Sequence, residues 1–112
     1  MKLDKETQEK IQELQIAEQN SQAILLQKQT FQLELNETIS AAEEVKKTKD
    51  EIFKIVGQVM IKAQKAEIEK ELEEKKRILE FRIKAIENQE ALFRKKLSSL
   101  QQEIEEKIKK SQ

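Results

Sequence analysis

Helix breakers are almost absent from this sequence of 112 residues, which has no proline and a single glycine. That glycine, Gly57, stands at the middle of the chain. Because proline and glycine are the residues that most often end a helix, a long uninterrupted helix can form on either side of it. Only 37% of the residues are apolar and 39% are charged, which leaves little material for a conventional globular core. We therefore expect two long helices rather than a globule.

The first half of the chain carries an apolar stripe with coiled-coil spacing. Steps of three and four residues pass through ten positions, of which seven are apolar: Leu14, Ala17, Ser21, Ile24, Lys28, Phe31, Leu35, Thr38, Ala42 and Val45. This period of about 3.5 residues is that of a helix packed along another helix. Ile11, Leu25 and Ile39 flank the stripe and widen it toward the face of a helix that touches more than one neighbour.

The second half carries a similar stripe, which Lys76 and Glu90 interrupt. Its apolar members are Leu72, Leu79, Ile83, Ile86, Phe93, Leu97, Leu100 and Ile104. Glutamates on or beside its outer faces precede lysine or arginine by four residues, for example Glu90 before Arg94 and Glu103 before Lys107. A turn at mid-chain brings the two helices side by side as an antiparallel pair. Helices of about 45 residues are each roughly 65–70 Å long.

Between the helices, residues 52–63 predict a β-hairpin. β-Branched residues concentrate there, and Gly57 takes the first central position of a two-residue loop, where a type II′ turn requires a positive φ. If Val56 pairs with Val59, the side chains divide between two faces of the hairpin. One face holds Ile52, Val56, Val59, Ile61 and Ala63. The other face holds Phe53, Ile55 and Met60.

Both faces of the predicted hairpin are mainly apolar, and an isolated two-stranded ribbon is marginally stable in water. Its outer edges also present unpaired backbone N–H and C=O groups. We therefore expect the hairpin to be the oligomerisation element, through Ile52, Phe53, Ile55, Val56, Gly57, Val59, Met60 and Ile61.

The expected organisation is one mainly α domain over residues 1–112, in which a long antiparallel coiled-coil hairpin carries one central β-hairpin. The expected bounds are 4–47 for the first helix, 52–63 for the β-hairpin and 66–111 for the second helix. Residues 46–50 are expected to break the first helix before the strand.

Composition excludes most enzyme chemistry. The chain has no cysteine and no histidine, so disulfides, thiolate nucleophiles, imidazole bases and the usual zinc sites cannot form. We expect no catalytic residues, no cofactor and no metal. Lysine and arginine number 22, as do aspartate and glutamate, so the chain has no bulk charge that favours nucleic acid or an anionic membrane. No apolar run reaches membrane-spanning length, and we expect an intracellular, soluble protein.

The segment 52–62, placed between two coiled-coil segments, resembles the β-class prefoldin subunit, which is also called the GimC subunit. Residues 27–35 are also similar to the first helix of that family. The resemblance implies an α2β4 hexamer with prefoldin α-class subunits and other β copies, whose hairpins form a β-barrel base. It further implies an ATP-independent chaperone, a holdase that grips non-native proteins at the coiled-coil tips and delivers them to a group II chaperonin. A cytoplasmic protein of an archaeon fits this family.

The resemblance implies that the chain termini lie at the free tips, so client-binding residues are expected there. The apolar candidates near the tips are Leu3, Ile11, Leu14, Ile16, Leu97, Leu100, Ile104 and Ile108. Some of them must hold the helices together. Ile11, Ile16 and Ile108 fall outside the strict seam, and they are the preferred client contacts.

The main alternative is a structural or tethering coiled coil that binds no client. A plain tether has no need of a ribbon with two apolar faces and a positioned glycine, so the hairpin favours the chaperone subunit. A membrane-surface helix pair is disfavoured because charges of both signs surround the helices and tryptophan is absent.

Overall fold

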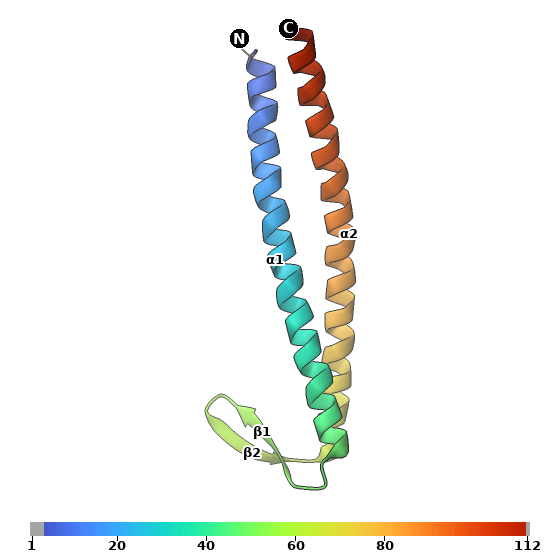
Figure 1. Cartoon of the computed structure of the whole chain (residues 1–112). Coiled ribbons are helices and arrows are strands. Elements are labelled where there is room, and N and C mark those ends of the chain that lie inside the picture. Colours follow the sequence, from blue (N-terminus) through green and yellow to red (C-terminus); the bar gives the residue numbers. More distant parts are fainter. Residues whose placement is uncertain (1–3, 112) are drawn as a thin grey trace. The chain divides into compact units, whose positions relative to one another are not determined.

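The computed structural model describes residues 4–111 of the chain as two helices and one two-stranded antiparallel sheet (Figure 1). The elements follow in the order α1 (Lys5–Lys47), β1 (Ile52–Val56), β2 (Val59–Ala63) and α2 (Lys65–Ser111). The predicted fold class, mainly α with one central β-hairpin, is confirmed. Helix α2 begins at Lys65, one residue before the expected position.

The chain divides into two compact units. We call the first the terminal unit, which comprises Met1–Gln29 and Ala85–Gln112 and is described over residues 4–29 and 85–111. We call the second the hairpin unit, which comprises Thr30–Lys84 and contains both strands.

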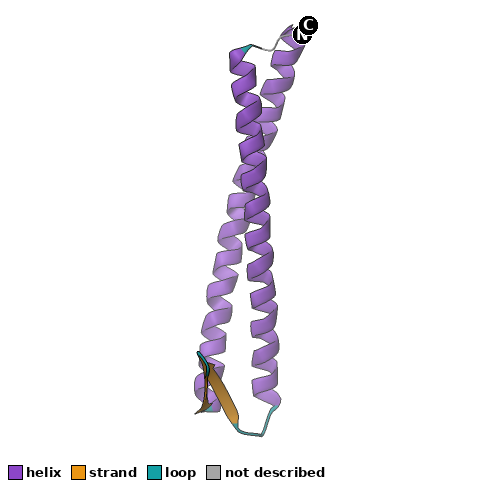
Figure 2. Ribbon diagram, turned by 90° about the vertical axis from the view of Figure 1, so that its left-hand side faces the viewer, coloured by secondary structure: helices purple, strands orange, loops and turns teal. Residues whose placement is uncertain are grey.

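In the terminal unit, the first part of α1 and the last part of α2 lie side by side (Figure 2). The predicted seam residues form its core. Five of its apolar side chains are at most 8% exposed: Ala17, Ile24, Ile86, Leu100 and Ile104. Burial of a large aliphatic side chain contributes about 1.5–3 kcal/mol, so this seam is what holds the two helix segments together.

Two seam positions in the terminal unit are charged, and they meet each other across the helix pair. Lys28 Nζ lies 2.9 Å from Glu90 Oε1, with side-chain exposures of 27% and 19%. Glu87 lies further away, at 4.0 Å from the same nitrogen. The hydrogen bond to Glu90 raises the pKa of Lys28 above its ordinary value. A polar pair within an apolar seam favours the one register that joins its partners, because other registers leave two charges without partners.

In the hairpin unit, the seam continues through Leu79 and Ile83, which are buried between the helices. The Thr38 hydroxyl is also buried, and it donates a hydrogen bond of 2.7 Å to the Glu34 carbonyl one turn earlier. The Arg82 guanidinium lies 5.8 Å from the centre of the Phe31 ring. This cation–π contact covers part of the aromatic face at the border of the seam.

A lysine from the start of α2 caps the end of α1. Lys65 Nζ donates hydrogen bonds to the carbonyl oxygens of Lys46, at 3.0 Å, and Thr48, at 3.2 Å. The last carbonyls of a helix lack partners within that helix and carry partial negative charge, so an ammonium group satisfies both needs. The Asp50 N–H donates to the Thr48 hydroxyl oxygen at 3.2 Å, which turns the chain toward β1.

The strands pair in the register that the sequence predicted, with Val56 opposite Val59 and Ile52 opposite Ala63. Gly57 has a φ of +64°, and no other described residue has a positive φ. Gln58 therefore has a negative φ, which agrees with a type II′ turn and excludes type I′. A Cβ atom on Gly57 would meet no atom within 4 Å, so lack of space is not the reason for glycine at this position. Glycine is favoured here because other residues rarely adopt a positive φ.

Candidate functional site

The β-hairpin exposes almost all of its apolar side chains. Six of them are between 50% and 70% exposed: Phe53, Ile55, Val56, Val59, Met60 and Ile61. Ile52 is half-buried and Gly57 is exposed. The pairing register places Phe53, Ile55 and Met60 on one face, and Val56, Val59 and Ile61 on the other. Each face of the ribbon therefore keeps at least half of three large apolar side chains exposed.

A groove of about 520 Å³ runs between β1 and the helices of the hairpin unit. Its apolar lining comes from all three elements: Ala41, Val45, Ile52, Phe53, Ile55, Ile68 and Leu72. At its border, Lys54 Nζ lies 2.9 Å from Glu71 Oε1, which ties β1 to α2. Lys62 Nζ of β2 lies 3.0 Å from Glu51 Oε1, beside the start of β1. Both ion pairs are exposed, so each contributes little to stability, and they leave the apolar faces of the ribbon uncovered.

The sheet of the hairpin unit has two strands, so each strand keeps one outer edge without a neighbouring strand. Backbone N–H and C=O groups on such edges readily accept a strand from another chain. Apolar faces and open edges are thus both present in one element of ten strand residues. This combination is what a hub built from several copies requires.

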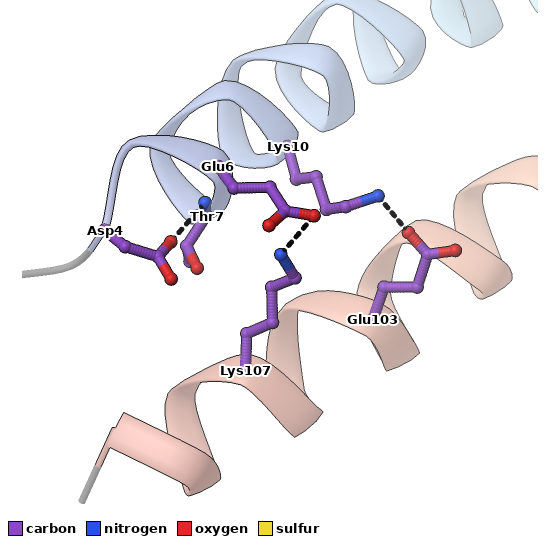
Figure 3. Close-up of polar contacts among 6 residues, drawn as sticks. All are labelled: Asp4, Glu6, Thr7, Lys10, Glu103 and Lys107. Atoms are coloured by element: carbon purple, nitrogen blue, oxygen red, sulfur yellow. Dashed lines mark hydrogen bonds and ion pairs between the residues drawn. The ribbon is translucent and has the colours of Figure 1, made fainter.

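Near the chain ends, ion pairs connect the two helices of the terminal unit (Figure 3). Lys107 Nζ lies 2.6 Å from Glu6 Oε1, and Lys10 Nζ contacts Glu103 Oε2. The hydrogen bond to Glu103 raises the pKa of Lys10. Asp4 caps α1, because its Oδ1 accepts a hydrogen bond of 2.7 Å from the Thr7 N–H. Ion pairs therefore join the two helices as far as Glu6 and Lys107, and Asp4 caps the start of α1.

The structure divides the expected client residues into three groups. Leu100 and Ile104 are buried in the seam, whereas Leu14, Leu97, Ile11 and Ile108 are half-buried. Ile16 is 59% exposed. Leu3 lies outside the described residues. Ile16 is therefore the large apolar side chain of this set that is most available to a client, and Ile11 and Ile108 offer part of their surface.

Two features of the terminal unit were missed from the sequence. Glu90 and Glu103, which the spacing pairs with Arg94 and Lys107 in their own helix, contact Lys28 and Lys10 of α1. Leu25, which was expected to widen the buried stripe, is 46% exposed, and its neighbour Leu26 is 65% exposed. A helical wheel drawn for α1 alone places Leu26 opposite the seam, and this signal was available from the sequence.

Within residues 4–111, no group of three or more acidic side chains is arranged to hold a metal ion. No helix in the same range combines the length and the apolar character needed to cross a membrane.

Comparison with known proteins identifies the same family along nearly the whole chain. Residues 8–111 match the family model described as prefoldin subunit. The prefoldin subunit beta of Saccharolobus islandicus is 35% identical over 111 residues, which cover 97% of this chain and 88% of the relative. That of Thermococcus onnurineus is 41% identical over 90 residues, which cover 79% and 78%.

A solved structure shows the same fold. The crystal structure of the prefoldin beta subunit from Thermococcus strain KS-1 superposes with a TM-score of 0.86 at 32% sequence identity, and the match covers 94% of each chain.

Proposed function

The chain belongs to the prefoldin family, and we propose that it is the β-class subunit of an ATP-independent holdase that binds non-native proteins. The observation that carries this proposal is the hairpin, which exposes six large apolar side chains on the two faces of one ribbon. Such a ribbon has no use in an isolated subunit, whereas it is the expected joining element of a multi-armed assembly.

We infer that the hairpins assemble this chain with prefoldin α-class subunits and other β copies into an α2β4 hexamer with a β-barrel base. Two properties support the assembly. Strand addition satisfies the open edges of the sheet, and stacking of the ribbons covers Phe53, Ile55 and Met60 on one face and Val56, Val59 and Ile61 on the other. The residues proposed for oligomerisation are those predicted from the sequence.

Client binding is proposed for the ends of the arms, with Ile11, Ile16 and Ile108 as the principal contacts. Full burial of one aliphatic side chain contributes about 1.5–3 kcal/mol, and a flexible client gains only part of this. A micromolar complex requires about 8 kcal/mol after the cost of ordering is included. One arm alone therefore binds weakly, and several arms on one base bind usefully through effective concentration.

Weak contacts at several arms also permit release without nucleotide hydrolysis. We also propose that the released client passes to a group II chaperonin in the cytoplasm, as the family resemblance implies. It assigns no catalytic residue, cofactor or metal to this chain.

The proposal is tested by mixing the chain with a prefoldin α-class subunit. Native mass spectrometry is expected to show a hexamer, and light scattering is expected to show that the complex halts aggregation of a diluted unfolded protein without ATP. If the hexamer forms and aggregation continues unchanged, the alternative of a structural or tethering subunit without client binding replaces the holdase.

The position of the client site is tested by shortening the arms. Removal of the first sixteen residues, about 24 Å of helix, and of the last ten, about 15 Å, takes away Ile11, Ile16 and Ile108. We expect this shortened complex to assemble but to lose client capture. Dissolution of the complex on shortening would show that the ends of the arms hold the subunits together, which contradicts free client-binding tips.

A further inference from the structure

Met60 places a thioether on an exposed apolar face of the hairpin. Methionine occurs at positions 1 and 60, and Met60 alone lies within the described residues 4–111. It belongs to β2, pairs with Ile55 of β1 across the ribbon and is 65% exposed. Phe53, on the same face, is 50% exposed. Solvent therefore reaches the Met60 side chain in the free subunit.

Few other side chains of this chain compete for an oxidant. The sequence has no cysteine, histidine, tryptophan or tyrosine. Without cysteine, a peroxide can form no sulfenic acid and no disulfide in this chain. The thioethers at positions 1 and 60 are therefore the sulfur groups that a mild oxidant meets.

Oxidation of Met60 consumes one molecule of a hydroperoxide, such as hydrogen peroxide. The sulfur attacks one peroxide oxygen with a lone pair, so the S–O bond forms while the O–O bond breaks. The leaving hydroxide takes up the proton of the transferred oxygen and departs as water. Sulfur loses two electrons and the peroxide gains them. The flexible apolar thioether becomes a polar, chiral sulfoxide.

A sulfoxide at position 60 does not suit an apolar interface. Its oxygen accepts hydrogen bonds, whereas Phe53 and Ile55 on the same face have no side-chain donor. Lys62, the cation of that face, already pairs with Glu51 at 3.0 Å. Covering this face would remove water from the sulfoxide oxygen without replacing its hydrogen bonds, and that cost opposes assembly.

We propose that Met60 is a redox-sensitive modification site, and that oxidation of its thioether by a hydroperoxide in the free subunit keeps the hairpin out of the complex. This role rests on the proposed assembly through the hairpin and adds a means of control to it. A subunit already in the complex is protected, because the neighbouring hairpins that cover Met60 exclude the peroxide. Methionine sulfoxide reductases restore the thioether, so the block is reversible.

Two substitutions separate the sulfur from the shape of the side chain. Met60→Leu keeps an apolar side chain of similar volume but has no sulfur to oxidise, and this variant still carries Met1. Met60→Gln places a neutral polar group of similar length on the same face, so it imitates the sulfoxide without any oxidant.

The experiment oxidises the free chain before it meets its partner. The chain is treated with hydrogen peroxide, catalase removes the peroxide, and an untreated prefoldin α-class subunit is added. Peptide mass spectrometry measures the sulfoxide at positions 1 and 60. We expect mass photometry on dilution to show that the oxidised chain assembles about tenfold more weakly than the untreated chain.

The controls have equally definite expected results. Peroxide treatment should leave assembly of the Met60→Leu chain unchanged, and the Met60→Gln chain should assemble weakly without treatment. Incubation of the oxidised chain with both sulfoxide reductases, which act on the two epimers, should restore assembly. Peroxide added to the preformed complex should oxidise position 60 several times more slowly than in the free chain.

The other outcomes overturn the role of Met60. If the chain with the sulfoxide at position 60 assembles as well as the untreated chain, or if peroxide impairs the Met60→Leu chain equally, the complex stands and Met60 does not control it. Equal oxidation rates at position 60 in the free chain and in the complex would show that assembly leaves this face open. If the untreated chain forms no complex with the α-class subunit, the proposed assembly itself fails, and the role of Met60 fails with it.

Discussion

The hairpin and the terminal unit both contain many aliphatic residues, but they differ in how far these side chains are exposed. In the terminal unit, Ala17, Ile24, Ile86, Leu100 and Ile104 are buried between the helices. In the hairpin, six large apolar side chains are at least half exposed. The terminal unit therefore buries its seam within one chain, while Ile16, Leu25, Leu26 and Leu92 stay exposed outside that seam. The hairpin leaves its apolar side chains uncovered within one chain, and we propose that other subunits cover them.

The largest expected effect comes from placing charges on the hairpin. Ile55 and Met60 are cross-strand partners on one face and are 70% and 65% exposed. In Ile55→Glu/Met60→Glu, association would bury two carboxylates, so we expect loss of the complex and a free chain of 13.2 kDa by native mass spectrometry. Circular dichroism is expected to show that α1 and α2 remain helical.

The matched control is Ile78→Glu/Phe81→Glu, which adds the same charges to exposed apolar residues of the helices. We expect this variant to assemble normally. Equal loss of assembly in both variants would mean that the helices of the hairpin unit, and not the ribbon alone, join the subunits.

The next largest effect is expected within the seam of the terminal unit. Lys28→Leu leaves the Glu90 carboxylate, which is only 19% exposed, without its partner. We expect a melting temperature several degrees lower, since an unpaired charge in a seam costs far more than an apolar residue there. Lys10→Leu is the comparison: Glu103 is 49% exposed and stays hydrated, so the decrease should be smaller. Equal decreases in the melting temperature of the two variants would show that an ion pair within the seam is no more important for stability than an exposed one.

The double variant Lys28→Leu/Glu90→Leu separates stability from register. It makes the seam more apolar, so we expect a melting temperature at or above that of the unaltered chain. The pairing register should become less uniform. Spin labels on Gln12→Cys and Gln101→Cys, both in the terminal unit and both exposed, are expected to give a broader distance distribution than in the unaltered seam. An unchanged distribution would show that the apolar residues alone fix the register.

How much of this arrangement was predictable depends on whether local pattern or pairing decides it. The seam follows from a period of 3.5 residues, and the hairpin register follows from Gly57, because a two-residue turn fixes which residues face each other. Lys28 and Glu90 are 62 positions apart in the sequence, and their pairing depends on the register between α1 and α2. No local sequence pattern specifies that register. For the same reason, the cap that Lys65 forms on α1 was not predicted.

A moderate effect is expected at the turn of the hairpin. Gly57 has a φ of +64°, and an L-residue with a Cβ pays about 1–2 kcal/mol in this region. Gly57→Ala should therefore weaken assembly by roughly tenfold when the complex is followed by mass photometry on dilution. Gly57→Asn is the control, because asparagine tolerates this conformation better and should weaken assembly less. An alanine variant as stable on dilution as the unaltered chain would show that assembly does not depend on the turn.

The smallest expected effect is a pH dependence confined to the terminal unit. Hydrogen bonds to Glu103 and Glu90 raise the pKa values of Lys10 and Lys28 above the ordinary 10.5. A raised pKa means that the folded state binds the proton more tightly, so these pairs stabilise the fold fully below pH 10.5 and lose their contribution as the pH rises through the higher folded values. In alkaline solution the pairing of the two helix segments should therefore loosen, and the spin labels on Gln12→Cys and Gln101→Cys should give a broader distance distribution. In Lys10→Arg/Lys28→Arg, the guanidinium groups stay charged, so the loosening should move to higher pH. The same loosening pH in both proteins would show that groups other than Lys10 and Lys28 cause it.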